Sequence, residues 1–128
     1  MFPKTVRLAL ALSACLASSA CVPLIVGGAA GAGAYAYVRG ELKETLSASP
    51  QQTQRAIESA IARLDLVVIA QSADGLTGSF DLQTGDYRRV SIRYKRVADL
   101  ATTVTIRVGA LGDKGLSDTI LREIKIAL

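Results

Sequence analysis

The sequence predicts an α+β fold, a two-layer sandwich in which two helices cover one face of an antiparallel sheet of about five strands. Between residues 66 and 108, successive runs alternate apolar and polar side chains and are separated by turn residues, as in antiparallel strands. Residues 50–64 and 116–128 instead repeat apolar side chains every three or four positions, as amphipathic helices do. The expected order is β-α-β-β-β-β-α, after a signal peptide and an apolar Gly/Ala-rich segment.

Residues 1–20 have the length and charge order of a bacterial signal peptide. MFPKTVR is a short basic start, and LALALSACLASSA is an apolar run of small residues that ends at a cysteine. This run is well short of the roughly 20 residues that a membrane-spanning helix needs. We therefore expect the segment to be cleaved rather than to remain as a membrane helix.

Cleavage just before a cysteine resembles the lipobox of bacterial lipoproteins, in which the thiol receives a diacylglycerol. Cys15 follows Leu-Ser-Ala and has the better local match, whereas Cys21 follows Ser-Ser-Ala. Cutting before Cys15 would leave an apolar run of only about seven residues, the short end of the usual range, so we expect lipidation at Cys21. Several acyl chains such as palmitate hold a protein firmly on a membrane. Val22, where an Asp would favour the inner membrane, favours the outer membrane.

Residues 21–40 contain the lipidation site and the run VPLIVGGAAGAGAYAYVRG. Gly27 and Gly31 stand four apart, a spacing that lets helices approach closely in a membrane. As a helix, the apolar part would reach about 25 Å, which is marginal for spanning a bilayer. Two interpretations stay open: a flexible tether between lipid and domain, or a helix that assembles a membrane oligomer or pore component. Tyr35 and Tyr37 would suit a membrane interface.

The order of an acylatable cysteine, a Gly/Ala-rich run, AYAYVRGEL and, later, TIRVGALGDKGLSDTIL resembles a family of short bacterial lipoproteins known only as a domain of unknown function. The resemblance covers residues 21–128. It supports Cys21 over Cys15, because the cysteine of that family stands at this distance before the glycine run. It implies no catalytic or binding residues.

Residues 41–128 are expected to form the folded domain. Its first strand covers residues 41–48 and carries Leu42 and Leu46 on one side. Ser49, Pro50 and Gln52 then form a helix start with a capping box. The apolar stripe of this helix comprises Ala56, Ile57, Ala60, Ile61 and Leu64.

Four strands and a second helix complete the domain. LVVIAQ (66–71) is nearly all apolar, and Asp74-Gly75 after it is a strong hairpin signal. The apolar positions of the next three strands are Phe80 and Leu82, then Val90, Ile92 and Tyr94, then Val104, Ile106 and Val108. The final helix is entered through GALGDKG, with Asp113 or Ser117 as its cap. Its stripe comprises Leu116, Ile120, Leu121, Ile124 and Leu128.

The composition argues against an enzyme. The chain has no His, the usual general base and metal ligand. The acidic residues are scattered over turns and helix surfaces rather than paired. Without Lys4 and Arg7 of the leader, 13 basic residues face 11 acidic ones, too small an excess to indicate nucleic acid. We expect no catalytic residue, cofactor, metal or nucleic-acid partner.

One row of side chains is a candidate binding surface. Arg89, Arg93 and Lys95 alternate with apolar residues on one strand, and Arg107 is expected on a neighbouring strand and the same face. Such a cluster can meet anionic lipid headgroups, although charged residues on an open sheet also keep it soluble. Asp81 is a candidate to pair with one of these arginines.

These observations together predict a non-enzymatic envelope lipoprotein, anchored through Cys21 and located at the outer membrane facing the periplasm. Its small domain would bind an envelope protein partner or help maintain the envelope. The sequence leaves the oligomeric state and the partner open.

Overall fold

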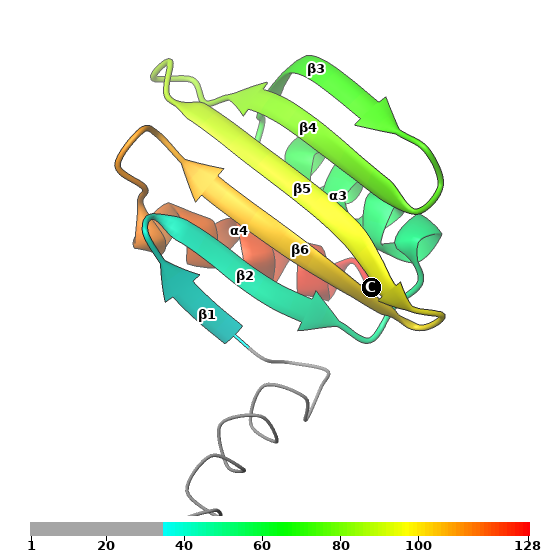
Figure 1. The fold of residues 1–128 in the computed structure, drawn as a ribbon. Helices are drawn as coiled ribbons and strands as arrows, with labels where there is room; N and C mark the ends of the chain where they lie inside the picture. Colours follow the sequence, from blue (N-terminus) through cyan, green and yellow to red (C-terminus); the bar gives the residue numbers. More distant parts are fainter. Residues whose placement is uncertain (1–34) are drawn as a thin grey trace, which may run out of the picture. The chain divides into compact units, whose positions relative to one another are not determined.

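The computed structural model describes residues 35–128, which form an open sheet of six antiparallel strands with two helices behind it (Figure 1). The elements are β1 (Tyr35–Val38), β2 (Glu41–Leu46), α3 (Pro50–Arg63), β3 (Val67–Ala73), β4 (Thr77–Gln83), β5 (Arg89–Ala98), β6 (Ala101–Val108) and α4 (Lys114–Ile126). The strands lie in the order β1-β2-β6-β5-β4-β3. The predicted α+β class is confirmed. The predicted signal peptide, Cys21 and the glycine run up to residue 34 lie outside the described residues.

The sheet has six strands where about five were expected. The additional strand is β1, which pairs with β2 from Tyr35 opposite Glu44 to Val38 opposite Glu41. The element order is therefore β-β-α-β-β-β-β-α. The physical reason is the alternation YAYV, which directs both tyrosines toward the helices and brings Tyr37 against the hydrophobic core. This strand falls in the segment that we expected to be membrane-proximal.

The helix α3 begins as the sequence predicts. The Gln52 amide donates to Ser49 Oγ at 3.2 Å, and the Ser49 amide donates to Gln52 Oε1 at 3.0 Å, which completes the capping box. Pro50 occupies the first helical turn, where its missing N–H costs no hydrogen bond. The predicted stripe is buried at Ala56, Ile57, Ala60 and Ile61 and half-buried at Leu64.

The core lies between the helices and the inner face of the sheet. All the apolar positions expected on the last three strands are buried there, together with Leu42 and Leu46 of β2. From α4, Ile120, Leu121 and Ile124 complete it. Leu128 was expected in the α4 stripe, but it lies beyond the helix end and is 51% exposed.

Two features of the sheet departed from what the apolar pattern indicates. The run LVVIAQ forms β3 at the sheet edge, and all seven residues of that strand are exposed. Conversely, Glu44 lies on the inner face between Leu42 and Leu46, 3% exposed, where Lys125 of α4 approaches its Oε1 to 2.5 Å. A half-exposed lysine thus neutralises the one charged residue buried in the described part of the chain. Over residues 35–128, neither helix is long and apolar enough to cross a membrane.

Candidate functional site

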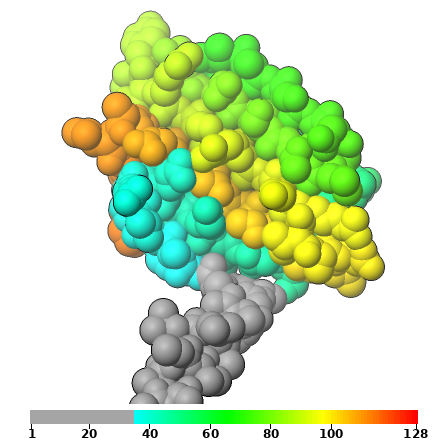
Figure 2. Space-filling model, viewed as in Figure 1, coloured from blue at the N-terminus to red at the C-terminus, as the bar shows by residue number. Residues whose placement is uncertain are grey.

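The outer face of the sheet, which carries no helix, holds all four basic residues that the sequence singled out. Arg89, Arg93 and Lys95 alternate along β5 with buried side chains, so they point away from the core. On β6, Arg107 lies opposite Ser91 and shares their face, as predicted. Figure 2 looks onto this surface, with α3 and α4 on the far side.

Glu41 is the acidic partner in this row. Its Oε1 lies 2.8 Å from a guanidinium nitrogen of Arg93 and 3.6 Å from one of Arg107. The sequence analysis did not identify Glu41 as this partner. More than 50 residues separate β2 from β6 in the chain, and no local sequence pattern predicts that these two strands pair. Asp81, the partner that the sequence suggested, lies on β4, and the residue opposite it on β5 is Ser91 rather than an arginine.

Lys43 is a further basic residue on the same face that the sequence did not single out. It lies on β2 opposite Thr105 and is exposed. Within residues 35–128, Lys43, Arg89 and Lys95 have no carboxylate within ion-pair distance, whereas Arg93 and Arg107 share one. The three unpaired cations are therefore the ones whose charge is available to a partner.

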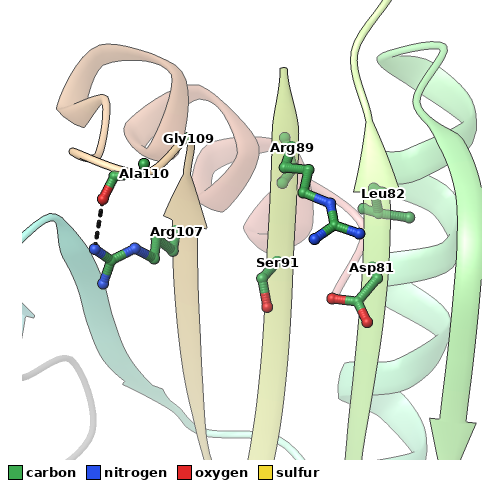
Figure 3. Close-up of a pocket in the computed structure, with 8 residues that line it drawn as sticks. Asp81, Leu82, Arg89, Ser91, Arg107, Gly109 and Ala110 are labelled. Carbon is green, nitrogen blue, oxygen red and sulfur yellow. Dashed lines mark hydrogen bonds between the residues drawn. The ribbon is translucent and has the colours of Figure 1, made fainter. Parts of the chain in front are cut away.

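A shallow depression of about 250 Å³ lies at one end of this face (Figure 3). Its polar lining comprises Asp81, Arg89, Ser91 and Arg107, and the backbone of Gly109 and Ala110 closes one side. Arg107 is fixed there, because its guanidinium donates to the Ala110 carbonyl at 2.7 Å. Figure 3 shows the Arg89 side chain extending over the depression toward Asp81. The two guanidinium groups point apart, that of Arg107 toward Ala110 and that of Arg89 toward Asp81 (Figure 3).

The two stretches that carried the family resemblance meet at the same end of the sheet. A Cβ on Gly40 would lie 2.7 Å from the Leu111 carbonyl oxygen, and one on Gly112 would lie 2.4 Å from Gly40 Cα. Both glycines also have positive φ, +80° and +83°. The turn of AYAYVRGEL and the loop of RVGALGD are thus in backbone contact. Their glycines have a structural role that the sequence alone did not reveal.

Tyr35 of β1 interacts with two residues in the first turns of α4. Its hydroxyl donates to Asp118 Oδ1 at 2.7 Å, and the Lys114 ammonium lies 5.3 Å from its ring centroid. The Lys114 and Tyr35 hydrogen bonds hold the pKa of Asp118 below its usual value, and Asp118 in turn raises the pKa of Lys114. These charges stabilise one another at the sheet edge.

The GALGDKG loop forms the capping turn of α4, as the sequence indicates. Asp113 is the N-cap of α4 and accepts the Leu116 amide at 3.0 Å. Arg88 lies 2.8 Å from its other oxygen. The hydrogen bond from the Leu116 amide lowers the pKa of Asp113 most, and the hydrogen bond from Arg88 lowers it further. A carboxylate therefore already occupies the position where a bound anion would sit.

The described residues contain no cluster of three or more His, Cys, Asp or Glu side chains that could hold a metal ion. The lipidation candidate Cys21 lies outside them, as do Gly27 and Gly31 of the oligomer interpretation.

The family model described as "Protein of unknown function (DUF3568)" matches residues 4–127, nearly the whole chain. No curated protein matches the chain significantly.

Proposed function

Since the chain belongs to DUF3568, a family of proteins of unknown function, we propose that it is a non-enzymatic bacterial envelope lipoprotein. A lipid on Cys21 anchors it to the outer membrane, and the α+β domain faces the periplasm as a binding module. The observation that carries the proposal is the position of Cys21, at the end of a basic and then apolar leader. Thirteen residues separate it from β1, the first described strand.

The side-chain chemistry supports binding over catalysis. The chain has no His, and lipidation of Cys21 with loss of the leader would leave no free thiol. Several of the described carboxylates are occupied in ion pairs or caps. Examples are Glu41 with Arg93, Glu44 with Lys125 and Asp113 with Arg88. Each of these acids has a structural role that accounts for its position.

The test is the mass of the N-terminal peptide of the mature protein, extracted from the membranes of a bacterial host. We expect a peptide that begins at Cys21 and carries a diacylglyceryl group, and we expect Cys21→Ser to abolish both the lipid and the cleavage. Cys15→Ser is the matched control and should leave the modified peptide unchanged. Lipid on Cys15, or an uncleaved chain without lipid, would contradict the proposal.

A further inference from the structure

Charge is unevenly distributed over the domain. The outer sheet face and its β1–β2 turn carry six basic residues against two acidic ones, Glu41 and Asp81. The basic residues are Arg39, Lys43, Arg89, Arg93, Lys95 and Arg107. This surface therefore has a formal charge of +4, while the rest of residues 35–128 sums to −2. The small net charge of the whole domain conceals one cationic face.

The shape of the face suits a flat anionic partner. Apart from Arg39, the cations lie on the three adjacent strands β2, β6 and β5. Neighbouring strands are about 4.8 Å apart, so the cluster is about 10 Å wide, and the six residue steps from Arg89 to Lys95 cover about 20 Å. The twist of about 20–25° between neighbouring strands moves the ends of a 20 Å stretch out of the plane by only a few ångströms over three strands. A planar surface can therefore approach all these side chains within one Debye length, about 8 Å at physiological salt.

The chain that precedes the domain keeps it near a membrane. Thirteen residues separate Cys21 from Tyr35, a length that spans at most about 50 Å when fully extended. It joins the domain at β1, beside the strand that carries Lys43. A short linker gives an effective concentration in the millimolar range, so even weak electrostatic attraction suffices for docking.

On the basis of the lipid anchor in the proposed function, we propose that the outer sheet face binds the phosphate groups of anionic phospholipids in the anchoring membrane. The domain then lies with its sheet on that membrane and its helices toward the periplasm. Lys43, Arg89 and Lys95 provide the attraction. Arg93 and Arg107, which share Glu41, contribute less because their charge is already partly neutralised.

The chain contains its own reporters for a test. Lys43 and Lys95 lie on the outer face, whereas Lys114 and Lys125 lie on α4. The full mature protein is reconstituted in vesicles of neutral phospholipid, or of the same lipid with anionic phosphatidylglycerol added. The rate at which an amine-reactive reagent modifies each lysine is then read by mass spectrometry.

We expect Lys43 and Lys95 to react several-fold more slowly on anionic than on neutral vesicles, while Lys114 and Lys125 react equally on both. At about 1 M salt the Debye length falls to about 3 Å, and the protection should disappear. Lys43→Gln with Arg89→Gln should weaken docking about 25-fold, about fivefold for each cation removed, and expose Lys95. The matched control, Arg55→Gln with Arg122→Gln, removes two exposed cations from the helices and should leave Lys95 protected.

Equal lysine rates on both kinds of vesicle would overturn this proposal and leave the basic row as a solubility feature. Protection on neutral vesicles that grows with protein density would assign the face to a second copy instead. A control pair that exposes Lys95 as strongly as the test pair would reduce the effect to net charge. None of these results bears on the anchor, which stands or falls with the mass on Cys21.

Discussion

Tyr94 shows how one side chain determines what its neighbours can be. It lies on β5 opposite Gly78 of β4, is 2% exposed, and donates its hydroxyl hydrogen to Gln54 Oε1 of α3 at 2.9 Å. Burial raises the pKa of this phenol further above neutral pH, where the hydroxyl is protonated and able to donate. The bond joins the sheet to α3 across the core. The ring occupies the space above Gly78, which explains a glycine near the start of β4.

We therefore expect Gly78→Ala to destabilise the domain by about 1–3 kcal/mol, because the new methyl group would lie 2.4 Å from the Tyr94 ring and force it to move. The measurement is urea unfolding followed by circular dichroism. The control is Gly85→Ala in the β4–β5 turn, where a Cβ meets nothing within 4 Å, and it should change stability by less than about 0.5 kcal/mol. Equal midpoints for the two variants would contradict this account of Gly78.

At the scale of elements, the sequence predicts well wherever the physics is local. The capping box at Ser49, the helix stripe around Ile57 and the period-two strand around Ile92 depend on neighbours a few residues away, and all were confirmed. The position of Arg107 beside β5 also followed from a short hairpin. Two features were not predicted, the edge position of β3 and the pairing of β2 with β6. Both depend on which strands pair over long sequence separations, which local patterns do not determine.

The start of α4 gives the clearest pH dependence among the elements. In the folded state the Leu116 amide and Arg88 lower the pKa of the Asp113 cap below its unfolded value of 3.8. The cap therefore stabilises the fold fully above about pH 4, and this stabilisation is lost as the pH falls toward the lower folded pKa. Asp113→Asn keeps a capping oxygen but does not titrate in this range.

We expect the urea midpoint of Asp113→Asn to fall less steeply than that of the wild type between about pH 4 and pH 2. Asp113→Ala removes the oxygen as well, so it should be less stable than Asp113→Asn at neutral pH and show the same shallow slope in acid. A wild-type slope in either variant would mean that this carboxylate does not contribute to acid unfolding.

For the whole molecule, the additional strand β1 determines where the domain begins. β1 covers the edge of β2, packs Tyr37 against the core and bonds Tyr35 to α4. Because apolar character continues from the glycine run into AYAYV, no change of composition marks a boundary at Tyr35, and only the alternation of the tyrosines indicates a strand. With β1 in the sheet, at most 13 residues remain between Cys21 and the fold, instead of the 19 that a domain beginning at Glu41 would leave.

A chain that begins at Ala32 should therefore be more stable to urea than one that begins at Glu41. We expect a difference of about 1.5–3 kcal/mol, comparable to the burial of one large side chain, because the shorter chain loses Tyr37 and exposes the β2 backbone edge. Tyr37→Ala in the longer chain is the control, since it separates side-chain packing from strand pairing and should account for only part of the loss. Equal urea midpoints for the two chains would contradict a stabilising role for β1, and residues 35–40 would then count as part of the linker. The linker's maximum reach would then rise from about 50 to about 70 Å, and membrane tethering would constrain the outer sheet face less closely.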